Sequence, residues 1–142
     1  MNLIAGNVLM DRNAPNDVLI PAKQSYENSK RIIEKWHETG RCKYAVTPRF
    51  AITSTPELME VSQSLFEENQ SCYLQTHLSE NIDEIKTTLS LFPENKNYLS
   101  IYDDYNLLSE KTLLAHSIHL EKLEREMIVG WDAFKTTPEM MH

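Results

Sequence analysis

The sequence Cys72-Tyr-Leu-Gln-Thr-His-Leu-Ser-Glu-Asn-Ile-Asp-Glu-Ile85 decides how the rest of the chain is interpreted. It starts as a short apolar run, reaches a histidine at His77, and continues from Ser79 into a segment with helical spacing of apolar residues. This order predicts a strand, a polar turn and a helix, with Glu80 three residues after the histidine. Parallel α/β proteins carry their chemistry at such strand ends, so this turn is the first candidate site.

The same order of strand and helix recurs along the whole chain. The predicted strands cover residues 3–10, 43–47, 71–77 and 112–115, and the predicted helices cover residues 22–39, 56–68, 79–91, 98–105 and 119–127. The first strand is interrupted by Gly6 and Asn7, and the second helix has Thr55 as a candidate N-cap before Pro56. Alternation of this kind predicts an α/β fold with four consecutive parallel β/α units.

Composition narrows the classes of protein to which the chain can belong. The 142 residues fit one domain, and no apolar run approaches the roughly 20 residues of a membrane helix. A net charge of −7 disfavours binding to the phosphate backbone of a nucleic acid. Cys42 and Cys72 form no C-x-x-C motif, which favours two reduced thiols. We therefore expect a cytoplasmic protein that binds neither nucleic acid nor membrane.

Reactive side chains follow three of the predicted strands. They are Arg49, Phe50, His77, Glu80 and His116. Because parallel neighbouring strands end at one edge of a sheet, we expect these side chains to lie together. The pattern indicates metal-assisted hydrolysis: we expect His77 to ligate a divalent ion, with zinc favoured by the ligand type, Glu80 to move a proton, and His116 to orient the water or stabilise an oxyanion. Arg49 can bind a carbonyl oxygen or ring nitrogen, and Phe50 can pack on a planar ring.

Each of these residues also has a purely structural interpretation. A histidine at a strand end is more often structural than a ligand, and Glu80 is a favourable acid in the first turn of a helix. Arg49 can pair with a surface carboxylate, and His37 is expected to be exposed to solvent. Only the expected proximity of His77, Glu80 and His116 at one edge favours the chemical interpretation.

Three segments carry a resemblance to a known family. Thr47-Pro-Arg-Phe50, Thr76-His-Leu-Ser-Glu-Asn81 and Ala115-His-Ser-Ile-His-Leu120 resemble the guanine deaminases of the amidohydrolase superfamily. The resemblance covers roughly residues 1–120 and leaves residues 121–142 as a helical or divergent tail. It implies four units of a TIM-type (β/α)8 barrel, which is incomplete here. It also implies zinc-dependent hydrolysis of guanine to xanthine and ammonia by an enzyme that is usually a homodimer.

The resemblance implies a role for each candidate at the metal. His77 resembles the zinc ligand, and Glu80 resembles the proton shuttle of the family's H-x-x-E motif. His116 resembles the histidine that contacts the attacking water. These implied catalytic and metal-binding roles agree with those expected from the residue types alone.

The resemblance also implies a set of residues that bind the substrate. Arg49 and Phe50 resemble the pair that recognises the purine, and Leu78 and Ser79 line the same pocket. The metal ligand and the proton shuttle described above complete the implied contacts with guanine.

Two features of the family pattern are absent from the sequence. The family's zinc also has an H-x-H pair and a strand-end aspartate, and this sequence has no H-x-H and no eighth strand. One imidazole cannot fix zinc, and four unclosed strands leave two open edges. We therefore expect the isolated chain to be inactive and marginally stable. The alternatives are a non-catalytic remnant of a decayed gene, a split-enzyme piece that needs a partner chain, and a related amidohydrolase acting on another heterocycle.

Overall fold

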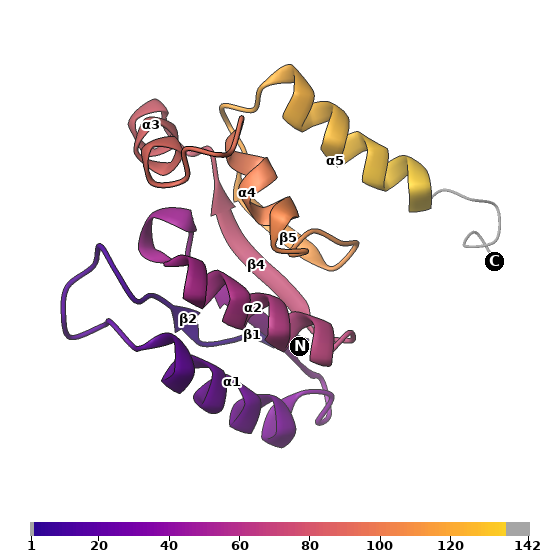
Figure 1. The fold of residues 1–142 in the computed structure, drawn as a ribbon. Coiled ribbons are helices and arrows are strands. Elements are labelled where there is room, and N and C mark those ends of the chain that lie inside the picture. Colours follow the sequence, from indigo (N-terminus) through magenta and orange to yellow (C-terminus); the bar gives the residue numbers. More distant parts are fainter. Residues whose placement is uncertain (1, 136–142) are drawn as a thin grey trace.

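A single parallel sheet organises the molecule (Figure 1). The computed structural model describes residues 2–135. The strands are β1 (Leu3–Ala5), β2 (Val8–Leu9), β3 (Cys42–Pro48), β4 (Tyr73–Leu78) and β5 (Thr112–His116). Their order is β1-β3-β4-β5, with β2 also paired to β3, and every pair is parallel. Spatial order follows chain order, which confirms the predicted consecutive β/α units.

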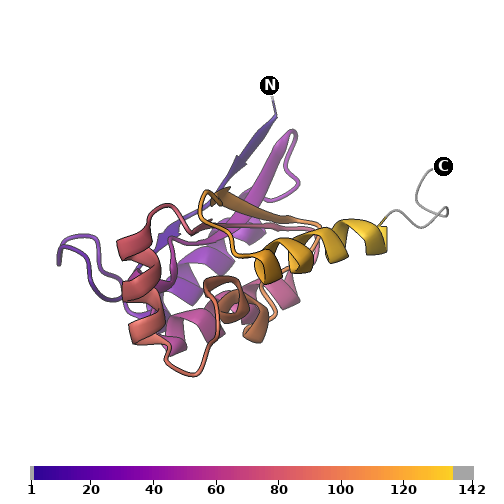
Figure 2. The same ribbon diagram turned by 90° about the horizontal axis from the view of Figure 1, so that it is seen from above.

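Helices connect the strands and gather along one side of the sheet, as Figure 2 shows. They are α1 (Ala22–Trp36), the short 3-10 helix η1 (Ala51–Thr53), α2 (Pro56–Glu68), α3 (Ile82–Leu91), α4 (Tyr98–Asp104) and α5 (Lys122–Lys135). Side-chain caps fix several starts: the Thr55 hydroxyl accepts a hydrogen bond from the Leu58 amide, as the sequence predicts. The predicted tail contains α5, while its residues 136–142 lie outside the described part of the chain, so the predicted division at residue 120 stays a prediction.

The predicted first strand is divided into β1 and β2, and the chain lies very close to β3 between them. β1 and β2 pair with β3 in the same register, Leu3 opposite Cys42 and Val8 opposite Thr47. Between them lies Gly6, where an added Cβ would sit 1.8 Å from the main-chain oxygen of Ala45. Only glycine allows this approach, which confirms the predicted interruption and gives its physical reason.

Alternation along β4 decides which residues face the core. Leu74, Thr76 and Leu78 are fully buried, whereas Gln75 is exposed and His77 is half-buried. Successive side chains of a strand point to opposite faces, so the buried set packs under the helices and His77 points to the open face. The core on the helical side is built from large apolar residues of α2 and α4, including Leu58, Met59, Leu65, Leu99, Ile101 and Tyr102.

The two outer strands leave apolar side chains uncovered. In the observed sheet order, β1 and β5 are each paired on one side only, as predicted. Leu3 and Ile4 on β1 and Leu113 on β5 are exposed. Between residues 2 and 135 no helix is both long and apolar enough to cross a bilayer.

Candidate active site

The main-chain carbonyl of Arg49 holds His77 at the carboxyl end of β4. This oxygen accepts the His77 amide at 3.1 Å and lies 2.6 Å from Nδ1 of the same residue. A carbonyl can only accept, so Nδ1 carries a proton, and in the neutral imidazole Nε2 then has the free lone pair. A metal-ligating histidine is usually oriented in this way by a partner on its other nitrogen. The environment of His77 therefore fits a metal ligand.

His116 lies beside His77 at the end of the neighbouring strand. The register places Leu78 opposite His116, and the two imidazole rings are stacked with centroids 5.2 Å apart. The backbone is left-handed at His116 (φ 70°) and at Ser117 (φ 53°). Residues other than glycine adopt this conformation at a cost, and such positions cluster at functional sites.

Glu80 completes the predicted group of three. Its Oε2 lies 3.6 Å from Nε2 of His116, and its side chain is half exposed, so it is accessible to solvent and to a ligand. The Glu80 amide donates to Oε2 of Glu84 at 3.1 Å, and the Glu84 amide donates to Oδ1 of Asn81 at 2.8 Å. Sequence reasoning missed Glu84, although Asn81-x-x-Glu84 has the spacing of a helix capping box.

Arg49 and Phe50 extend the group toward the neighbouring strand end. The Phe50 ring meets the His77 ring edge-on at 6.1 Å, and the Arg49 guanidinium lies 5.3 Å from the centre of the Phe50 ring. The exposed Arg49 makes no ion pair within residues 2–130. The structural interpretation of Arg49 as half of a surface salt bridge therefore finds no carboxylate partner among residues 2–130. Its Nη1 donates to the Met10 sulfur at 3.7 Å, and the remaining donors of the exposed guanidinium can reach a polar ligand.

Leu78 and Ser79 are brought to the same edge but are fully buried. Leu78 belongs to the core beneath the helices. Ser79 has left-handed backbone (φ 51°), and its carbonyl accepts hydrogen bonds from the amides of Ile118 and His119. These two residues tie the ends of β4 and β5 together. Their predicted contact with a substrate stays a prediction.

The described residues offer an incomplete set of metal ligands. Within that set, no group of three His, Cys, Asp or Glu side chains is placed to hold a metal ion. His77 and His116 are the two imidazoles at the edge, and Glu80 is the nearest carboxylate. A closed zinc site needs about four ligands, so further donors are required beyond these.

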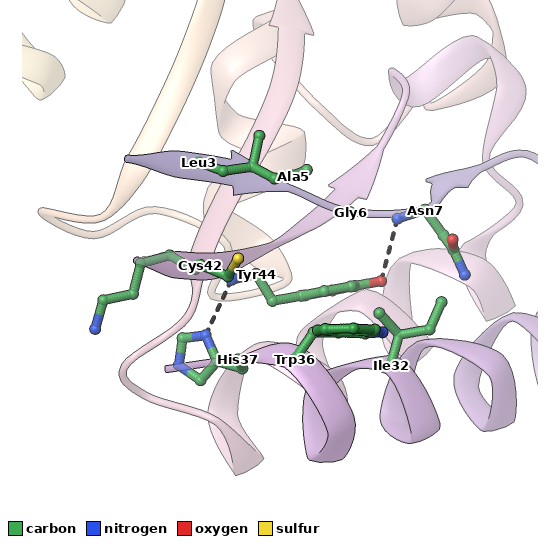
Figure 3. Close-up of a pocket in the computed structure, with 10 residues that line it drawn as sticks. Leu3, Ala5, Gly6, Asn7, Ile32, Trp36, His37, Cys42 and Tyr44 are labelled. Atoms are coloured by element: carbon green, nitrogen blue, oxygen red, sulfur yellow. Dashed lines mark hydrogen bonds between the residues drawn. The ribbon is translucent and has the colours of Figure 1, made fainter. Parts of the chain in front are cut away.

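An apolar cavity of about 420 Å³ lies elsewhere, at the amino-terminal half of β3 (Figure 3). Ile32 and Trp36 reach from α1 toward β1 and β3 to line it, with Leu3 and Tyr44 opposite. Its apolar lining lacks the convergent reactive groups of the carboxyl edge, which therefore remains the candidate site.

His37, which also lines this cavity, is a structural residue. Its Nδ1 accepts the Tyr44 amide at 2.9 Å, and its Nε2 lies 2.8 Å from the Ser71 hydroxyl. The expectation that His37 is exposed is therefore wrong, because the chain folds back from α1 into β3 and half-buries the ring.

Parallel β/α units with two histidines and a glutamate at the carboxyl edge define a segment of a TIM-type barrel with its chemistry at the strand ends. The chain belongs to the amidohydrolase family, whose profile matches residues 1–138. It is similar to guanine deaminase from Escherichia coli K12, with 47% identity over 137 residues, and to guanine deaminase from Dictyostelium discoideum, with 39% identity over 125 residues. These alignments cover 96% and 87% of this chain.

Solved structures agree with the sequence comparison. E. coli guanine deaminase superposes with a TM-score of 0.91 and 46% identity over 92% of this chain and 31% of that one. Guanine deaminase from C. acetobutylicum, solved with bound guanine in its active site, gives a TM-score of 0.87, with 32% identity over 92% of this chain and 31% of that one. The chain spans 30% of the E. coli protein and 28% of the Dictyostelium protein in the sequence alignments. The predicted incomplete barrel is thereby confirmed.

Proposed function

We propose that this chain forms part of a zinc-dependent guanine deaminase site, which converts guanine and water to xanthine and ammonia. One observation carries the proposal: Nδ1 of His77 is held by the Arg49 carbonyl while its ring stacks on His116. That arrangement leaves one lone pair of the neutral ring directed for a metal, beside the His116 imidazole and the half-exposed Glu80 carboxylate. The similarity to guanine deaminases, one of them solved with guanine, supports guanine as the substrate.

Each side chain has a role in the proposed reaction. His77 holds the ion through Nε2, and a bound zinc ion would supply Lewis-acid activation of water. Glu80 accepts a proton from the water and delivers it to the departing ammonia, which its exposed position near His116 permits. His116 hydrogen-bonds the attacking water and orients it toward the reacting carbon of the guanine ring.

The strand end before η1 recognises the substrate. Arg49 donates hydrogen bonds to the guanine carbonyl oxygen or a ring nitrogen, and Phe50 packs against the purine plane. The contact between the guanidinium and the Phe50 ring limits the directions in which Arg49 can point. Pre-orientation of this kind reduces the entropy lost when a ligand binds.

A chimera tests the proposed function directly. The matching segment of E. coli guanine deaminase is replaced by residues 2–138 of this chain, and xanthine formation and zinc content are measured. We expect stoichiometric zinc and turnover of guanine above that of other aminopurines and pterins. A folded chimera that holds zinc but turns over only another heterocycle contradicts guanine as the substrate. A folded chimera without zinc contradicts the role of His77.

The open edges of the sheet favour a second candidate, a split-enzyme piece. β1 and β5 expose apolar side chains and unpaired strand edges, which a partner chain bearing the other strands would cover. Mixing the chain with E. coli guanine deaminase that lacks the matching segment should then restore xanthine formation. Failure of the mixture alongside an active chimera contradicts assembly from two chains.

We also propose a cytoplasmic location. Cys42 and Cys72 are free thiols, which is typical of a reducing compartment. Fractionation of cells that produce the chain tests this location.

A further inference from the structure

The hydroxyl of Tyr102 joins three segments beneath the candidate site. It donates to the carbonyl of His77 at 2.8 Å and accepts from the amide of Ala51 at 3.2 Å and from the hydroxyl of Thr76 at 3.1 Å. A tyrosine hydroxyl has one donor and two acceptor positions, so all three are used. Burial raises the pKa of Tyr102 to about 12, so the hydroxyl remains a donor at neutral pH.

These three bonds connect the metal-binding part of the proposed site to its substrate-binding part. Thr76 and His77 belong to the end of β4, whereas Ala51 begins η1 directly after Arg49 and Phe50. The two segments meet again at the Arg49 carbonyl, which orients the His77 ring. Tyr102 therefore fixes, from the fully buried side, the spacing between the strand ends that carry the reactive side chains.

We infer that Tyr102 is a positioning residue for the proposed reaction, which sets the orientation of the His77 imidazole relative to Arg49 and Phe50 without contacting substrate. The catalytic part of this inference rests on the proposed function. The positioning itself is argued from the hydrogen bonds of Tyr102 alone. Displacement of a reacting group by about 1 Å can lower a rate by about a hundredfold, so a bond of this kind has catalytic consequences.

The chain contains a matched control one helical turn away. Tyr98 lies on the same helix and is equally buried, but its hydroxyl makes no hydrogen bond to the described residues of β4 or η1. Its ring lies 5.7 Å from that of Tyr102. Tyr98→Phe therefore removes a buried hydroxyl from α4 without removing a link between β4 and η1.

Nitrogen-15 NMR of the full chain tests the inference without requiring turnover. Spectra are recorded at about pH 8.5, where imidazoles are neutral. In the wild-type chain we expect His77 to carry its proton on Nδ1. In Tyr102→Phe the two strand ends separate, the bond to the Arg49 carbonyl weakens, and the ring nitrogen shifts move toward the other tautomer. The Ala51 amide should also exchange on the order of tenfold faster, because it loses its acceptor.

The Tyr98→Phe variant is the control for the loss of a buried hydroxyl, and the wild-type chain provides a second measurement. Tyr98→Phe should leave the His77 ring shifts and the Ala51 exchange rate unchanged. Unchanged His77 shifts in a folded Tyr102→Phe chain overturn the inference. Should Tyr102→Phe not fold, the wild-type hydroxyl proton decides: a slowly exchanging Tyr102 proton close to the Ala51 amide supports the link, and a rapidly exchanging one overturns it. An inactive chimera combined with a shifted His77 tautomer contradicts the proposed function and leaves the positioning intact.

Discussion

His77 and His116 stack across the ends of two neighbouring strands, with ring centroids 5.2 Å apart and ring planes inclined by 27°. The parallel register sets this proximity, and the left-handed backbone at His116 turns the second ring toward the first. Both rings therefore border one small volume at the carboxyl ends of β4 and β5. Two imidazoles there can share an ion or a water molecule, but they do not enclose it.

The isolated chain should bind zinc only weakly, because His77 alone is assigned as a ligand and about three of the four coordination positions are left to water. After dialysis against metal-free buffer, elemental analysis should give much less than one zinc per chain, and guanine should not be converted. His77→Ala should remove the residual binding, whereas His119→Ala, at an exposed position, should not change it. Stoichiometric zinc together with guanine turnover would contradict this expectation.

Replacing the proposed proton carrier should separate chemistry from metal binding. In the chimera with E. coli guanine deaminase, Glu80→Gln should lower kcat by roughly 10²- to 10⁴-fold. Zinc content should not change, because the carboxylate is assigned no ligand role. Glu34→Gln, an exposed change on α1, serves as the control. A Glu80→Gln enzyme with unchanged kcat refutes the proton-transfer role.

Gly6→Ala should destabilise the fold by about 1–3 kcal/mol or more, the usual range for overpacking. The new methyl group would lie 1.8 Å from the main-chain oxygen of Ala45, so β1 must move away from β3. Gly130→Ala is the matched control, because nothing lies within 4 Å of an added methyl group in α5. Urea unfolding should show the control to be neutral or more stable, since alanine favours helix. Equal stability of both variants would exclude the close approach.

His37 should make stability fall as the pH drops below about 6.5, the ordinary pKa of an unfolded histidine. Burial lowers the pKa of His37 in the folded state. The negative charge of Glu38 raises this pKa, and the positive charges of Lys43 and Lys111 lower it. The folded state thus prefers the neutral ring, whose Nδ1 accepts the Tyr44 amide. This contribution is complete above the unfolded pKa and disappears toward the folded pKa.

Thermal unfolding between pH 7 and pH 5 measures the effect of His37, which we expect as a lower unfolding temperature at the lower pH. His37→Gln should remove this part of the pH dependence, whereas His119→Gln should retain it. A His37→Gln chain with the wild-type pH dependence would show that other groups cause it.

Cys72 should resist thiol reagents until the chain unfolds. Burial raises the pKa of the Cys72 thiol to about 11, and the side chain is fully buried, so little thiolate is accessible at pH 8. The half-buried Cys42 should react first. Mass spectrometry after brief alkylation should find one modified cysteine in the native chain and two in urea. Rapid modification of Cys72 under native conditions would contradict its burial.

The strands and the site edge could be predicted from the sequence because their signals are local. The apolar run before His77 indicates a strand, and Thr55 with Pro56 marks the start of α2, which the structure confirms. Parallel order then brings the strand ends together. The meeting of His77 with His116 therefore follows from topology.

The remaining features depend on contacts between segments distant in sequence. Nothing local distinguishes Tyr102, whose hydroxyl joins β4 to η1, from Tyr98, whose hydroxyl makes no hydrogen bond to the described residues of either segment. The burial of His37 depends on Ser71, which is 34 residues away. Such contacts are set by the curvature of the sheet and by the docking of helices on it, and neither has a periodic signal in the sequence.

The Arg49 carbonyl has a consequence for how such a site can diversify. Residue 49 orients His77 through its main chain, and in the proposed function its side chain binds the substrate. Every amino acid supplies the same carbonyl, so a mutation at this position can alter ligand preference while the histidine keeps its tautomer. Selection can therefore change the heterocycle that is accepted without rebuilding the support of the metal ligand.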